Sequence, residues 1–77
     1  MNWSKLPNIQ WLIENDGNIE LGRIGPVACA AVASDEDTML AALVRRDGES
    51  LDALLVRLED ALDDALNHEI FTDEING

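Results

Sequence analysis

The sequence predicts an α+β domain, an antiparallel β-meander of three to four strands with a C-terminal amphipathic helix packed on one face. Three observations lead to this fold. Two apolar stretches flank a turn signal in residues 9–24, small apolar residues fill 27–33, and residues 50–69 carry apolar side chains at helical spacing. With 77 residues, of which 47% are hydrophobic, the chain is read as one globular domain over 1–77. A domain this short also makes a homodimer possible.

Residues 9–24 are predicted to form the first hairpin, with a turn around Asp16 and Gly17. A two-residue loop would scatter charge over both faces of the hairpin. A three-residue loop ending in Gly17 pairs Trp11 with Leu21 and gathers the apolar side chains on one face. We therefore expect two strands in this register, with Gly17 in the left-handed conformation.

The next two segments predict the remaining strands. Residues 27–33 follow a Gly-Pro break and favour a strand packed closely under another element, because their side chains are small and apolar. Residues 35–46 allow two interpretations. Ser34 could cap a helix with an acidic first turn and a basic last turn, or "SDED" could be a hairpin turn before a fourth strand. We favour the strand.

The C-terminal helix has the strongest pattern. Ser50 is a natural N-cap, and the helix should end near Asn67 or His68, because the same stripe extended further would turn Glu69 inward. Its apolar stripe is expected to cover Trp11 and the small residues of the third strand, and consists of Leu51, Leu54, Leu55, Leu58, Leu62, Ala65 and Leu66. Residues 70–77 are predicted to be a loose tail in which only Ile70 and Phe71 touch the core.

The charge of the chain restricts its partners. Sixteen acidic residues against five basic ones give a formal net charge of −11. This argues against direct binding of nucleic acid or of an anionic membrane, since both are bound through Lys and Arg. The apolar run at 27–33 is too short to span a bilayer, and "MNWSKLPNIQ" lacks the pattern of a signal peptide. Together with the single cysteine, Cys29, this predicts a cytoplasmic protein.

The sequence shows no motif that is typical of catalysis or of cofactor binding. The one histidine, His68, is expected at the helix end, and Cys29 sits in an apolar run where a thiol is ordinarily a small buried hydrophobe. Neither "SDEDT" nor "ENDGN" follows a calcium-loop spacing, and no phosphate-binding glycine motif with a following Lys occurs. The stretch "GRIG", residues 22–25, is interpreted as a bend at the end of a strand. We expect no catalytic residue, no cofactor and no metal, and hence not an enzyme.

The stretch "EDALDDALNHE", residues 59–69, holds the candidate partner-binding face. Asp60, Asp63 and Asp64 fall opposite the leucine stripe, with Glu59 and Asp52 on the flank. An amphipathic helix ordinarily has a solvated polar face. Here, however, Asp60 and Asp64 are like charges four residues apart, and Asp63 and Asp64 lie toward the negative end of the helix dipole.

These observations favour a small acidic, non-enzymatic protein-interaction module that binds another protein with a basic surface. The alternative within binding is an acidic decoy that imitates nucleic acid and blocks a basic DNA- or RNA-binding protein. A small enzyme subunit is the third hypothesis, and it has the least support because no set of catalytic residues is found.

The stretches "LVRRDGESLDALLVRLEDAL", "FTDEIN" and "LGRIGPVA" resemble a group of short proteobacterial proteins, often encoded near mobile elements, that have no assigned activity. The resemblance covers most of the chain. It implies no particular activity and gives no residue a role.

Overall fold

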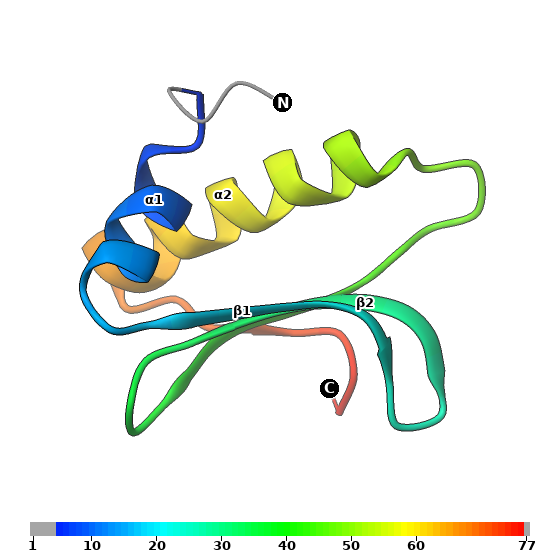
Figure 1. Cartoon of the computed structure of the whole chain (residues 1–77), viewed down its shortest axis with the longest axis horizontal. Coiled ribbons are helices and arrows are strands. Elements are labelled where there is room, and N and C mark those ends of the chain that lie inside the picture. The colour runs from blue at the N-terminus through cyan, green and yellow to red at the C-terminus, as the bar shows by residue number, and fades with distance from the viewer. Residues whose placement is uncertain (1–4, 77) are drawn as a thin grey trace.

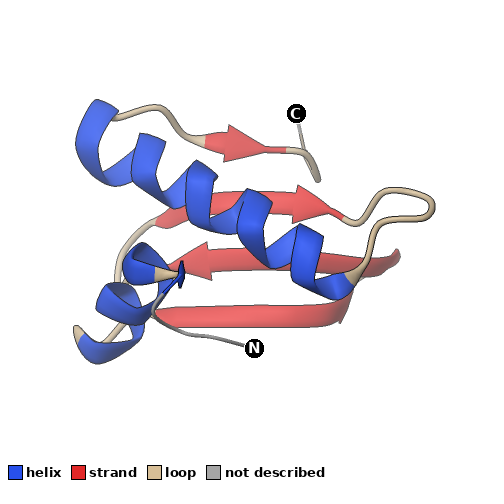
Figure 2. Ribbon diagram, turned by 90° about the horizontal axis from the view of Figure 1, so that it is seen from above, coloured by secondary structure: helices blue, strands red, loops and turns tan. Residues whose placement is uncertain are grey.

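The computed structural model describes residues 5–76, which fold into a four-stranded sheet with two helices on one face (Figures 1 and 2). The elements follow in the order α1 (Pro7–Glu14), β1 (Asn18–Ile24), β2 (Val27–Ser34), β3 (Met39–Val44), α2 (Leu51–His68) and β4 (Thr72–Asp73). Strands β1, β2 and β3 form the predicted antiparallel meander. The α+β fold with the C-terminal helix across the sheet is confirmed.

Strand β4 makes the sheet mixed, because it pairs in parallel with β3. A parallel pair needs a crossover connection, and α2 is that crossover. The helix is capped at its N-terminus by Ser50, whose hydroxyl oxygen accepts a hydrogen bond from the Ala53 N–H at 3.0 Å, and at its C-terminus by Glu69, which has a left-handed φ of 55°. The predicted bounds of this helix are therefore confirmed.

The core lies between α2 and the sheet. Strand register places Ala31 opposite both Leu21 and Leu43, and Ala33 opposite Ala41, so that small side chains occupy the middle of the sheet. Alanines there let a helix rich in leucine pack close to the backbone. The largest fully buried side chains are Ile9, Leu12, Leu54, Leu58 and Leu62. Leu51 and Leu66, at the two ends of the predicted stripe, are 44% and 36% exposed instead.

The first predicted strand is wrong, because residues 7–14 form helix α1. Pro7 stands at the start of the helix, where its fixed φ is favourable and its missing N–H is not needed. Ile9 and Leu12, three residues apart, are both 1% exposed. The alternation of Ile9, Trp11 and Ile13 suggested a strand, but Trp11 and Ile13 are about half exposed. Strand β1 pairs with β2 and not with residues 9–14.

The turn between α1 and β1 constrains Gly17 in a different way from the one predicted. The positive φ belongs to Asp16, at 67°, and not to Gly17. The Gly17 N–H donates to the Leu12 carbonyl oxygen at 2.8 Å. A Cβ on Gly17 would lie 2.7 Å from that oxygen and closer still to the Leu12 side chain. The glycine is required because the turn packs directly on Leu12.

We therefore expect Gly17→Ala to lower the free energy of unfolding by about 1–3 kcal/mol, the usual cost of overpacking. Urea denaturation measures the loss. Asp16→Gly is the control, since glycine adopts a positive φ without strain and should cost little. A Gly17→Ala protein as stable as its parent would mean that Leu12 does not pack on this turn.

Residues 39–44 are strand β3, so the strand interpretation of 35–46 is confirmed. The reason lies in Asp35, whose Oδ1 accepts hydrogen bonds from the Asp37 N–H at 2.9 Å and the Thr38 N–H at 2.7 Å. A carboxylate that binds the backbone two and three residues ahead stabilises a turn. The acidic segment therefore reverses the chain and does not begin a helix.

Residues 70–76 differ from the loose tail that was predicted, while Gly77 lies outside the described residues. Thr72 and Asp73 form β4, and the Glu74 N–H donates to the Ala42 carbonyl oxygen at 2.8 Å. Ile70 and Phe71, expected to touch the core, are each 54% exposed. The segment is held by backbone pairing and by Glu74, and not by Ile70 or Phe71.

Candidate functional site

The acidic face of α2, defined here as Asp60, Asp63 and Asp64, keeps its place in the structure. Asp60 and Asp63 are exposed, and Asp64 is half-buried. Asp63 accepts a hydrogen bond from the Asn67 side-chain amide at 2.7 Å. Among residues 5–76 both ion pairs involve Arg57, so no cation neutralises these three carboxylates. Asp52 is exposed but lies two helical turns away, about 12 Å along the axis, and is not part of this face.

Glu59 does not belong to the acidic face, contrary to the sequence interpretation. It is 7% exposed and points at the start of α1. Its Oε2 accepts from the Asn8 N–H at 2.9 Å and its Oε1 from the Ile9 N–H at 2.9 Å. The first N–H groups of a helix have no partner within the helix and carry partial positive charge. Glu59 therefore caps α1 from another helix and joins the two helices.

Trp11 and Leu66 form a second surface that sequence reasoning missed. Trp11 was expected under the C-terminal helix, but it is 51% exposed, and Leu66 is 36% exposed. Both side chains line two neighbouring hollows. The hollow toward the β2–β3 turn has about 300 Å³ and is also lined by Leu12, Asn15, Asp35, Glu36, Asp37 and Leu40. The other has about 320 Å³ and is also lined by Asn8 and Asn67.

We call Trp11 and Leu66 the Trp11–Leu66 ridge. Asn67 connects it to the acidic face, because this residue lines one hollow and donates to Asp63. The sequence signal that could have predicted α1 is the three-residue spacing of Leu6, Ile9 and Leu12 around Pro7. A helix that buries these residues places Trp11 on its outer side.

Three side chains at the end of α2 come together through the helical spacing of their residues, which differs from the spacing of a calcium-binding loop. Potential ligand atoms of Asp63, Asp64 and His68 lie within 4.8 Å of one another. Asp63 and His68 are exposed, Asp64 is half-buried, and Asp63 is hydrogen bonded to Asn67. Exposed acidic groups are common without a bound metal ion, and His68 therefore lies beside the acidic face as a neighbouring surface side chain.

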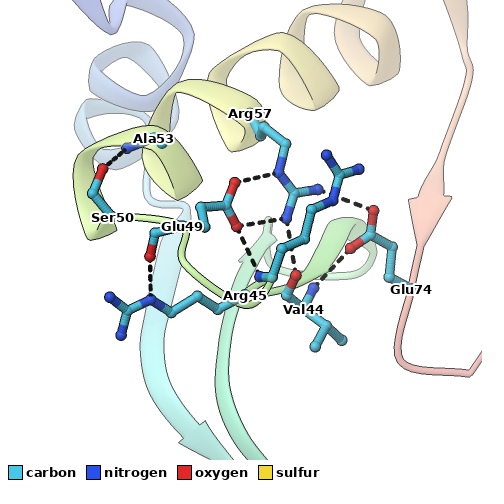
Figure 3. A network of polar contacts seen from close by, with 8 residues as sticks. Val44, Arg45, Glu49, Ser50, Ala53, Arg57 and Glu74 are labelled. Carbon is cyan, nitrogen blue, oxygen red and sulfur yellow. Dashed lines mark hydrogen bonds and ion pairs between the residues drawn. The ribbon is translucent and has the colours of Figure 1, made fainter.

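At the other end of the molecule, Arg57 is the centre of a polar network (Figure 3). Its Nε and Nη2 donate to the two carboxylate oxygens of Glu49 at 2.7 and 3.0 Å, its Nη2 also donates to the Val44 carbonyl oxygen at 2.9 Å, and its Nη1 donates to Glu74 at 3.1 Å. Glu74 in turn accepts from the Val44 N–H at 2.9 Å. The network joins β3, α2 and the C-terminal segment, which is a structural role.

Arg45 and Arg46 both contact the same network, Arg45 through its side chain and Arg46 through its backbone N–H. The Arg45 Nε donates to the Glu49 carbonyl oxygen at 2.7 Å, and the Arg46 N–H donates to the Glu49 carboxylate at 3.0 Å. The adjacent hollow of about 500 Å³ is lined by Cys29 and both arginines, but also by Asp47 and Glu49. Opposite charges therefore balance in its wall. Cys29 is half-buried and packs against the core.

The network makes stability depend on pH. Hydrogen bonds from Arg57, and next from the Arg46 N–H, lower the pKa of Glu49 from 4.5 to about 2. Because the folded-state pKa is the lower one, the ionised carboxylate stabilises the fold above about pH 4.5, and this stabilisation is lost as the pH falls toward 2. We expect Glu49→Gln to lower Tm at neutral pH and the gap to its parent to close between about pH 4.5 and 2.

Thermal melts of the parent and Glu49→Gln across this range measure the gap. The variant must be compared with its parent at each pH, because a second carboxylate also makes stability depend on pH. Hydrogen bonds from the backbone N–H groups of Asn76 and then Ile75 lower the pKa of Asp73. Asp47→Asn changes a carboxylate of the same loop that has no ion pair among the described residues, and it serves as the control. A gap that is as wide at pH 2 as at pH 6 would contradict the role of Glu49.

No protein-family model, curated protein or solved structure matches this chain. No helix of residues 5–76 has the length and apolar character needed to cross a bilayer.

Proposed function

We propose that the chain is a non-enzymatic protein-interaction module whose acidic face binds a basic segment of another protein. One observation supports this above all. Asp60, Asp63 and Asp64 have no cationic partner in the described part of the chain. The acidic residues with a clear structural task do have partners, since Glu49 and Glu74 bind Arg57 and Glu59 caps α1.

The unpaired carboxylates carry a cost that a structural role does not explain. Asp60 and Asp64 repel each other across one helical turn, and Asp63 and Asp64 lie toward the negative end of the helix dipole. Each arrangement costs a few tenths of a kcal/mol. A cationic partner relieves both. The net charge of −11 further attracts such a partner over a distance of about a Debye length, 8–10 Å.

The surroundings of Cys29 and His68 support a non-enzymatic role. Cys29 lines a hollow whose described residues include no histidine that could activate the thiol. His68 lies beside Asp63 and Asp64 on the surface of α2. We place the module in the cytoplasm, because its single cysteine cannot form a disulfide within the chain.

The test replaces Asp60, Asp63 and Asp64 together with Asn. We expect unchanged or slightly higher folding stability, because the replacement removes repulsion and keeps the shape. Proteins captured by the parent should bind this variant less, mainly through slower association. The parent and the variant are each immobilised, and quantitative mass spectrometry measures how much of each captured protein the variant retains relative to the parent.

A matched control separates the face from the overall charge. Asp16→Asn, Glu20→Gln and Asp47→Asn change three other exposed carboxylates, so both triple variants carry −8 where the parent has −11. If the two variants retain the parent's partners equally well, the acidic face has no recognition role and only keeps the protein in solution.

A further inference from the structure

The Trp11–Leu66 ridge is an apolar surface without a partner in the described chain. Trp11 exposes 51% of its surface between two hollows of about 300 and 320 Å³. In Figure 1, α1 is a short helix that lies beside α2. Tryptophan is enriched at the centre of protein interfaces, because it offers a large, rigid apolar area. A ridge between two hollows suits an apolar side chain that packs against the indole.

Carboxylates surround this ridge. Asp35, Glu36 and Asp37 line the hollow toward the β2–β3 turn, and Asp63 adjoins the other hollow through Asn67. Within the described chain, neither hollow has a lysine or arginine in its wall. Asp35 is engaged by backbone N–H groups, whereas Glu36 and Asp37 have no hydrogen bond or ion pair to their carboxylates in residues 5–76. An occupant with cationic groups at both sides of an apolar one therefore complements the site.

We propose that the Trp11–Leu66 ridge is the anchoring part of the recognition site, and that it takes one large apolar side chain from a basic segment of the partner. Lysines or arginines before and after that side chain lie against Glu36 and Asp37 on one side and Asp63 on the other. This inference rests on the proposed function and adds the class of segment recognised. A purely basic stretch would use the carboxylates alone and would leave Trp11 in water.

Two synthetic peptides test the inference. One is an oligolysine with a single central leucine, and the other has serine in place of that leucine. Calorimetry on the Trp3→Phe protein gives both affinities, and the emission of Trp11, then the sole tryptophan, reports contact with the indole. We expect the leucine peptide to bind about tenfold more tightly, which corresponds to burying part of a leucine. It should also shift the Trp11 emission, and the serine peptide should not.

Variants locate the effect. Trp11→Ala and, independently, Leu66→Ala should remove most of the tenfold difference while leaving the affinity for the serine peptide nearly unchanged. Val56→Ala is the matched control, because Val56 is 52% exposed on the same helix and lines neither hollow. At 1 M salt, where the Debye length is about 3 Å, the leucine peptide should keep more of its affinity than the serine peptide.

Equal affinities for the two peptides, with no change in Trp11 emission, would overturn this inference. Lysine-dependent binding that disappears in the variant with Asn at 60, 63 and 64 would still support the proposed function. If that variant binds both peptides as tightly as the parent does, the proposed function itself fails. The two failures are therefore distinguished by the same set of titrations.

Discussion

Replacing Leu58 or Leu62 with Ala is expected to lower the free energy of unfolding by about 2–5 kcal/mol, the usual range for truncating a buried leucine. Both side chains are 0% exposed and belong to the core between α2 and the sheet. The same core includes Ala31, Ala33 and Ala41, which cannot reach into a cavity because they have no side chain beyond Cβ. A small domain has little stability to spare, so either variant should be largely unfolded at moderate temperature.

Urea denaturation followed by circular dichroism measures both losses. Val56→Ala is the control, since it shortens an exposed side chain of the same helix and should change stability by no more than about 0.5 kcal/mol. Losses below about 1 kcal/mol at both Leu58 and Leu62 would mean that this face of α2 does not pack on the sheet.

Glu59→Ala is expected to lower the free energy of unfolding by about 2–3 kcal/mol, because it leaves the N–H groups of Asn8 and Ile9 without their acceptor. Amide exchange at these two residues should become faster, since α1 is no longer held at its start. Glu59→Gln keeps one acceptor oxygen and should lose less. Denaturation in urea gives the stabilities, and hydrogen exchange gives the local effect.

Asp60→Ala is the control for Glu59, because it removes the neighbouring carboxylate, which is exposed. Its stability should stay within about 0.5 kcal/mol of the parent's. A Glu59→Ala protein as stable as Asp60→Ala, with unchanged exchange at Ile9, would show that Glu59 does not cap α1.

Most of the fold could be predicted because its strongest signals are local. The leucine spacing from 51 to 66 and the cap at Ser50 specify α2, and the small apolar run specifies β2. Helix α1 could not be predicted with the same rules, because its eight residues form too few turns to show a clear helical spacing of apolar side chains. In addition, part of its stabilisation comes from Glu59, about fifty residues away in the sequence. Strand β4 was missed for a related reason, since it has only two residues and the contacts that follow it, from Glu74 to Val44 and Arg57, are distant in the sequence.

The candidate site was predicted in part. Helical spacing alone places Asp60, Asp63 and Asp64 opposite the leucines, and they remain on the surface. Glu59 was misplaced because a residue on the flank of a helix is exposed or buried according to what packs beside it, and the prediction had no helix there. Trp11 was misplaced by the same error, which put its side chain on the inner face of a strand.

Chemical-shift mapping shows whether the acidic face and the Trp11–Leu66 ridge together bind a basic segment. The ¹⁵N-labelled chain is titrated with the leucine-containing oligolysine peptide. We expect the shifts to concentrate at the Trp11 indole N–H, at the backbone amides of 35–37 and at those of 60–67, and to weaken in the variant with Asn at 60, 63 and 64. Shifts confined to β1 and residues 45–50, or equal shifts in that variant, would contradict this expectation.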